Sequence, residues 1–160
     1  YFAVPERGIE PQPGGDSIFS GRHAESVATL FHAIALGAES VSKQDFSNEM
    51  ASKLIWNCVF GLLCDVFECT VGEVCSEHAE NVGALSAELV SVANECIHTT
   101  LDAQATTAGL IEYSMSIPTY RGTLKQWQWR NGWFTDAAQR LKIDTPMHDK
   151  FLVGRRLDGR

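Results

Sequence analysis

Residues 51–67, ASKLIWNCVFGLLCDVF, are apolar over most of their length and would make about four or five helical turns. Two polar residues interrupt the stretch, Lys53 and Asn57, four positions apart. On a helix, Lys53, Asn57, Gly61 and Cys64 lie nearly above one another, so the polar groups form one narrow strip. A helix that is apolar around most of its girth is typical of the centre of a bundle. We therefore expect an all-α fold, a helical bundle arranged around this segment.

The composition of the 160 residues is that of an ordinary globular domain, with 44% hydrophobic and 21% charged residues. The formal net charge is −7 and no basic run occurs, which argues against nucleic acid and anionic membranes as partners. No uninterrupted apolar run reaches the eighteen or so residues that would cross a bilayer. These features favour a soluble protein.

The five cysteines are odd in number and form no C-x-x-C pair. This pattern favours buried free thiols in a reducing compartment and does not distinguish cytoplasm from plastid. The five histidines are scattered and have no metal-ligand spacing. We expect no metal site.

Helical spacing of apolar residues predicts the other elements. A first helix within residues 22–37 would present Val27, Leu30, Phe31 and Ile34 and stop at Gly37. Further helices are predicted at residues 46–67, 80–101 and 123–142, and the chain is expected to be all-α from about residue 22. Gly132 should have a packing or site reason, because glycine within a helix costs about 1 kcal/mol relative to alanine.

Capping signals support these helices. Ser42 with Asp45 and Thr70 with Glu73 each have the spacing of a capping box. Thr145 followed by Pro146 predicts the start of a last helix. Pro118 and Gly122 indicate a turn between helices.

The strip on residues 51–67 has two interpretations. If it faces a cleft, Lys53 and Asn57 offer donors to a ligand and Gly61 leaves space beside them. A partly buried lysine has a lowered pKa, which suits a general acid. Alternatively, Lys53 extends to solvent near the helix start and Asn57 lies at the rim. The residues alone leave both open.

Several motifs together resemble a known family. KLIWN at residues 53–57, YSM at 113–115, RNGWF at 130–134 and DTPMH at 144–148 resemble, in order, the C-terminal helical domain of ketopantoate reductases. SIFSG at residues 17–21 resembles the last piece of the Rossmann domain that precedes it. The segments KLIW and WRNGWF most resemble the corresponding segments of ketopantoate-reductase-like proteins of plants and algae.

The resemblance implies a domain organisation and an activity. Residues 1–22 would be a linker and the tail of a missing N-terminal Rossmann domain, and residues 23–160 the helical substrate and dimerisation domain. The family reduces a 2-oxo acid with NADPH, which implies 2-dehydropantoate 2-reductase-like activity and a role in pantothenate biosynthesis. NADPH would be bound mainly by the upstream domain, because this chain has no G-x-G-x-x-G.

Individual roles follow from the same resemblance. Lys53 would be the general acid that protonates the carbonyl oxygen, while Asn57 and Ser114 would bind the substrate. Gln126 stands where the family has an acidic substrate-binding residue, Gly61 where it has a second Asn, and Pro118 where it has an Asp. These departures leave an alternative, a non-catalytic relative whose helical domain serves dimerisation or small-molecule binding.

Three tryptophans, Trp127, Trp129 and Trp133, fall within seven residues. Aromatic residues at this spacing are typical of a core or a subunit interface rather than of a ligand cage. A homodimer through the helical domain is therefore a further expectation.

Overall fold

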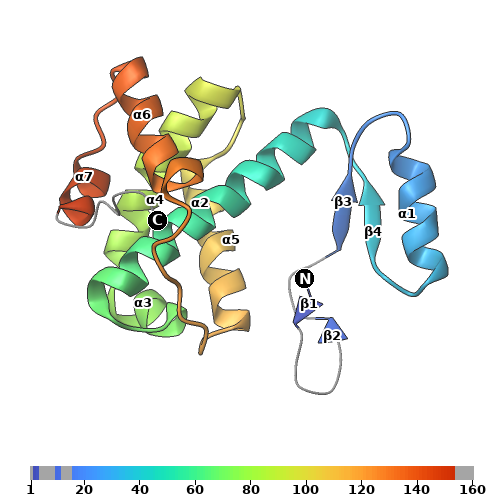
Figure 1. The fold of residues 1–160 in the computed structure, drawn as a ribbon, viewed down its shortest axis with the longest axis horizontal. Helices are drawn as coiled ribbons and strands as arrows, with labels where there is room; N and C mark the ends of the chain where they lie inside the picture. Colours follow the sequence, from blue (N-terminus) through green and yellow to red (C-terminus); the bar gives the residue numbers. More distant parts are fainter. Residues whose placement is uncertain (1, 4–9, 12–15, 154–160) are drawn as a thin grey trace. The chain divides into compact units, whose positions relative to one another are not determined.

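The computed structural model describes residues 2–3, 10–11 and 16–153 and is mostly helical, which confirms the predicted fold class (Figure 1). The elements in chain order are β1 (Phe2–Ala3), β2 (Glu10–Pro11), β3 (Ser17–Phe19), α1 (Ala24–Ala33), β4 (Ala38–Ser40), α2 (Lys43–Phe67), α3 (Val71–Glu77), α4 (Ala79–Ile97), α5 (Ala103–Ser116), the 3-10 helix η1 (Trp127–Trp129), α6 (Asn131–Leu141) and α7 (Pro146–Leu152). Backbone contacts divide the chain into two compact units, Tyr1–Ser47 and Asn48–Arg160. The predicted domain boundary after residue 22 stays a prediction.

The first unit contains a β-α-β arrangement. β3 pairs in parallel with β4, with Ser17 opposite Ala38 and Phe19 opposite Ser40, and α1 connects the two strands. β1 pairs with β2 in antiparallel fashion. The prediction of purely helical structure after residue 22 missed β4, because a three-residue strand has no readable alternation.

α1 packs against the rest of its unit through residues other than the predicted ones. Ala24 and Ala28 are buried, and the Phe31 ring contacts the Phe19 ring edge-on at 5.0 Å. Leu30 and Ile34, predicted as part of the packed face, are each 67% exposed. The helix also ends at Ala33, before Gly37, through a left-handed residue at Ala35. The apolar stripe of α1 is therefore only half covered in the described chain.

α2 is the central helix of the second unit, as predicted. It starts slightly earlier than expected, where the Asp45 N–H donates to the Ser42 hydroxyl at 3.0 Å and that hydroxyl donates to the Asp45 carboxylate at 2.6 Å. Its residues Cys58–Cys64 are all buried. By length and composition α2 is the one helix among the described residues that could cross a membrane, which is weak evidence because the core helix of a soluble protein passes the same test.

The apolar stripe of α4 is buried as predicted. Val82, Leu85, Leu89 and Val92 have no exposed surface, and together with α2, Phe134 and Phe151 they form the hydrophobic core. α4 ends earlier than expected, because His98 adopts a left-handed conformation that stops the helix. α5 follows, capped by the Asp102 carboxylate, which accepts from the Ala105 N–H at 2.7 Å.

The start of α3 combines a predicted cap with a tertiary one. Thr70 and Glu73 form the expected capping box, and the hydrogen bond from the Thr70 N–H lowers the pKa of Glu73. The next free donors, the Val71 and Gly72 N–H groups, donate to the carbonyls of Tyr120 and Pro118. The loop after α5 is thereby held against α3.

The helix predicted at residues 123–142 begins only at Asn131. Gln126 is left-handed, with φ of 52°, and the chain then makes the short turn η1 before α6 starts. The Trp127 ring folds back onto Gly132, where an added Cβ would lie 2.5 Å from the indole nitrogen. This contact is the packing reason that Gly132 was predicted to have.

Candidate functional site

The two residues of the predicted polar strip lie one turn apart on α2. Lys53 is exposed and Asn57 is half-buried. The Asn57 amide donates to the Lys53 carbonyl at 2.8 Å, so it folds back along its own helix. The exposure of Lys53 in the described chain agrees with the alternative in which its side chain reaches solvent.

The space expected beside Gly61 is filled. A Cβ on Gly61 would lie 2.9 Å from the Thr123 carbonyl oxygen, and a Cβ on Gly122 would lie 2.7 Å from the Phe60 carbonyl oxygen. The backbones of α2 and of the loop before η1 therefore cross in contact at this pair of glycines. The expectation that Gly61 leaves room for a ligand was wrong, because this loop occupies that room.

Ser114 is placed against the same turn of α2, but inside the protein. It has no exposed surface, its hydroxyl donates to the Leu110 carbonyl at 2.8 Å, and it accepts from the Trp56 indole N–H at 2.9 Å. The predicted substrate-binding residue Ser114 thus contacts the same turn of α2 through Trp56, which directly precedes Asn57.

Trp56 is the centre of an aromatic cluster, which we define as Trp56, Phe60, Tyr113 and Tyr120. Its ring is 5.7 Å from Phe60 and stacked, 5.1 Å from Tyr113 and edge-on, and 6.0 Å from Tyr120. Phe60 is fully buried and Tyr120 is 43% exposed, so the cluster runs from the core to the surface. Sequence reasoning missed it, although the Trp within KLIWN was a visible signal.

Gln126 and Pro118 lie on the loop between α5 and η1. Gln126 is exposed, and its carbonyl accepts from the Trp129 N–H at 2.9 Å. Pro118 is packed on Gly72, where an added Cβ would lie 2.8 Å from the proline ring. Lys53 and Asn57 therefore share one turn of α2, and Ser114 of α5 contacts that turn through Trp56. Gln126 lies on a separate loop.

The five cysteines are free, and two of them, Cys58 and Cys64, are buried. Burial raises the pKa of the Cys58 thiol and that of Cys64. Both thiols stay protonated near neutral pH and are poor nucleophiles. They belong to the packing of α2 rather than to a reactive site.

Three polar residues join α4, α6 and α7: the half-buried Glu88 and the buried Asn131 and His148. The Glu88 carboxylate accepts from the backbone N–H groups of Met147 and His148 at 2.8 and 2.9 Å, which caps α7 in place of the Thr145 side chain. The His148 ring, fully buried, bonds Asn131 through Nε2 at 2.9 Å, and its Nδ1 has no partner. Burial lowers the pKa of His148 to about 4, so the ring is neutral near neutral pH.

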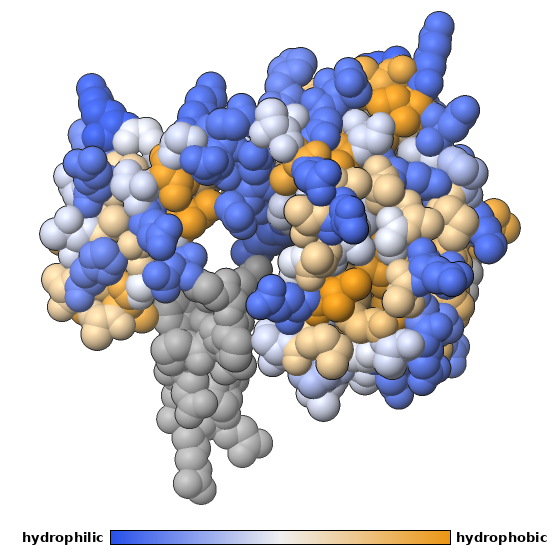
Figure 2. All heavy atoms as spheres, turned by 180° about the vertical axis from the view of Figure 1, so that it is seen from behind, coloured by the Kyte–Doolittle hydropathy of each residue, from blue (hydrophilic) through white to orange (hydrophobic). Residues whose placement is uncertain are grey.

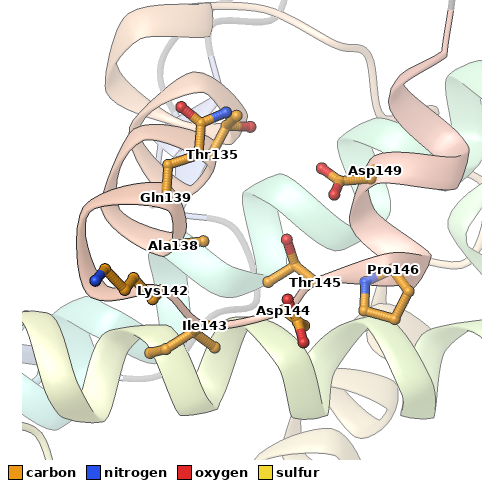
Figure 3. Close-up of a pocket in the computed structure, with 9 residues that line it drawn as sticks. All are labelled: Thr135, Ala138, Gln139, Lys142, Ile143, Asp144, Thr145, Pro146 and Asp149. Carbon is orange, nitrogen blue, oxygen red and sulfur yellow. The ribbon is translucent and has the colours of Figure 1, made fainter.

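A pocket of about 470 Å³ lies between α6 and α7 (Figure 3). It is lined by Thr135, Ala138, Gln139, Lys142, Ile143, Asp144, Thr145, Pro146 and Asp149. The Thr145 hydroxyl points into the space between the helices, while the Lys142 side chain points away from α7. None of the four predicted site residues lines this pocket.

The described residues offer neither a cluster of metal ligands nor a dinucleotide-binding turn. Within residues 2–3, 10–11 and 16–153, no group of three His, Cys, Asp or Glu side chains is arranged to hold a metal ion. The turn from β3 to α1 contains one glycine, Gly21, where a dinucleotide fingerprint needs three. These residues do not fit a nicotinamide coenzyme by themselves.

Comparison with solved structures shows the same fold in larger proteins. A PanE/ApbA family ketopantoate reductase from Ralstonia eutropha JMP134 has a TM-score of 0.74 and 17% identity over 96% of this chain and 55% of its own. A D-mandelate dehydrogenase in complex with NADH has a TM-score of 0.70 and 15% identity over 84% of this chain and 51% of its own. A 2-dehydropantoate 2-reductase from Porphyromonas gingivalis W83 has a TM-score of 0.65 and 15% identity over 86% of this chain and 45% of its own.

The chain spans about half the length of these three proteins. No curated protein matches it. The family model described as the C terminus of ketopantoate reductase PanE/ApbA matches residues 45–153, which include α2 from its third residue onward and every later helix of the described residues. This chain belongs to the ketopantoate reductase C-terminal family.

Proposed function

We propose that this chain is the substrate-binding part of a reductase that uses NADPH to convert a 2-oxo acid into a 2-hydroxy acid, with Lys53 as the general acid. The observation that carries the proposal is the exposed Lys53 one helical turn from Asn57, within the region that matches the family. Lys53 is exposed in the described chain, so it lies on a surface that a ligand or a covering domain can reach.

The chemistry divides between this chain and the coenzyme. Reduction of a ketone adds a hydride to carbon and a proton to oxygen, and NADPH is the hydride donor of the proposed reaction. The proton is what this chain supplies: the Lys53 ammonium donates it to the carbonyl oxygen as negative charge develops there. The Asn57 amide, which now donates to the Lys53 carbonyl, would turn one N–H to the substrate.

A preceding Rossmann domain is part of the proposal. Parallel strands occur almost only in sheets covered on both faces, and β3 and β4 make a parallel pair of three residues each. The exposed Leu30 and Ile34 of α1 fit a helix that packs on a larger sheet. The unit Tyr1–Ser47 therefore suits the last part of such a sheet.

The alternative is a non-catalytic relative that uses the helical domain for dimerisation or binding. The complete burial of Ser114 favours it, because a substrate cannot reach that hydroxyl without displacing the Trp56 indole. NADPH oxidation by the full-length protein with a panel of 2-oxo acids that includes ketopantoate distinguishes the two. Turnover of any member supports the reductase, whereas coenzyme binding with no turnover across the panel supports the alternative.

A further inference from the structure

We propose that the reductase site accepts a 2-oxo acid that carries an aromatic ring, and that the aromatic cluster holds this ring. The inference rests on the proposed function, since it assigns the substrate class of the same site. The observation behind it is the contact between Trp56 and Ser114 beside the Lys53–Asn57 strip.

Trp56 is the side chain that a substrate bound next to Lys53 would touch. Trp56 follows Lys53 by three positions on α2, so the two side chains are neighbours on the helix surface. Its indole N–H is bonded to the buried Ser114 hydroxyl, which fixes the ring and covers that hydroxyl. A ligand on this side of Lys53 meets an indole ring instead of a serine hydroxyl.

Trp56, Tyr113 and Tyr120 form the aromatic surface next to Lys53. Tyr113 is edge-on to Trp56 at 5.1 Å and Tyr120 is tilted to it at 6.0 Å, both within the range of attractive ring pairs. Trp56 and Tyr113 are half-buried and Tyr120 is 43% exposed, so ring surface remains open to a further ring. On the helical unit, hydrophobic residues reach the surface among hydrophilic ones (Figure 2).

Gly61, Pro118 and Gln126 provide no carboxylate for a substrate. The space at Gly61 is filled by the Thr123 carbonyl, and the Pro118 carbonyl accepts from the Gly72 N–H at 3.0 Å. Gln126 is exposed and carries no charge. A substrate with a hydroxylated side chain finds no carboxylate at these three positions, whereas a ring finds three aromatic partners.

The test compares phenylpyruvate, 4-methyl-2-oxopentanoate and ketopantoate as substrates of the full-length protein with NADPH. We expect kcat/KM for phenylpyruvate to exceed that for ketopantoate by about tenfold or more, because a ring buried on this cluster gains apolar and ring contacts. The aliphatic acid, of similar size but without a ring, should fall between them.

Two variants connect the preference to the cluster. Tyr120→Ala removes the most exposed ring but keeps the backbone carbonyl that accepts from Val71, and should lower the ratio of kcat/KM for phenylpyruvate to kcat/KM for ketopantoate about three- to tenfold. Tyr120→Phe keeps the ring and should behave as the wild type.

The outcomes separate the two proposals. A preference for ketopantoate overturns the assignment of an aromatic substrate and leaves the reductase intact. A preference for phenylpyruvate that Tyr120→Ala does not change overturns the role of the cluster. Absence of turnover with every 2-oxo acid overturns the proposed function and this inference with it.

Discussion

The Trp127 ring lies directly on Gly132, where an added Cβ would be 2.5 Å from the indole nitrogen. Alanine normally stabilises a helix interior by about 1 kcal/mol relative to glycine, but here the ring must shift. We expect Gly132→Ala to lower the free energy of unfolding by about 1–3 kcal/mol, measured by urea titration. The matched control is Gly83→Ala in α4, where nothing lies within 4 Å and a gain of up to about 1 kcal/mol is expected. Equal gains in both variants would contradict the contact.

His148 makes stability depend on pH. Its pKa is about 4 in the folded protein, below the 6.5 of a free histidine, because it is desolvated. The unfolded chain therefore binds a proton at higher pH than the folded one. As a result, the contribution of neutral His148 to the free energy of unfolding is complete above pH 6.5 and is lost as pH falls towards 4. The shift corresponds to a loss of up to about 3 kcal/mol.

The comparison variant is His148→Asn, which keeps a donor for Asn131 but does not titrate. We expect chemical unfolding at pH 7 and pH 4.5 to show a smaller loss of stability for the variant than for the wild type. Parallel pH profiles for the two proteins would show that His148 does not control this dependence.

For single residues, the sequence predicted the helix face that a residue occupies better than it predicted the groups that the residue contacts. Lys53 and Asn57 could be placed on one face of a helix because helical spacing alone decides that. The filled space beside Gly61 could not be predicted, since the Thr123 carbonyl that fills it comes from a loop about sixty residues away in the sequence. The burial of Ser114 could not be predicted either, because it involves a contact between α5 and Trp56 of α2.

Among the elements, α7 depends on a cap supplied by α4. The Glu88 carboxylate accepts from two backbone N–H groups at the start of α7, a charge-assisted pair of bonds. We expect Glu88→Ala to cost about 1–3 kcal/mol of stability and to raise amide hydrogen exchange in α7 well above that in α3. Glu88→Gln, which keeps one acceptor, should lie between the two proteins. Unchanged protection of α7 in Glu88→Ala would contradict this cap.

Helix starts with local caps were predictable and those set by tertiary contacts were not. Ser42 with Asp45 and Thr70 with Glu73 are complete within four residues, and both caps formed as expected. The start of α6 was placed too early, because it depends on the left-handed Gln126 and on Trp127 folding back. β4 was missed because its pairing with β3 spans about twenty residues of intervening chain.

For the whole molecule, Trp129 tests the proposed homodimer through the helical domain. Its side chain is 68% exposed, whereas Trp127 and Trp133 are half-buried against the protein. An exposed tryptophan is a typical interface anchor. We expect Trp129→Ser to weaken dimerisation at least tenfold in sedimentation equilibrium, and the neighbouring Gln128→Ser to leave it unchanged. A wild-type protein that is monomeric at all concentrations would contradict the dimer.

The central claim is that Lys53 supplies the proton in reduction of a 2-oxo acid, and steady-state turnover by the full-length protein tests it most directly. The measurement compares kcat for NADPH oxidation in the wild type, in Lys53→Ala and in Lys43→Ala, the last at the exposed start of the same helix. The account predicts a loss of about 10²–10⁴-fold for Lys53→Ala and none for Lys43→Ala. Wild-type turnover in Lys53→Ala would contradict it.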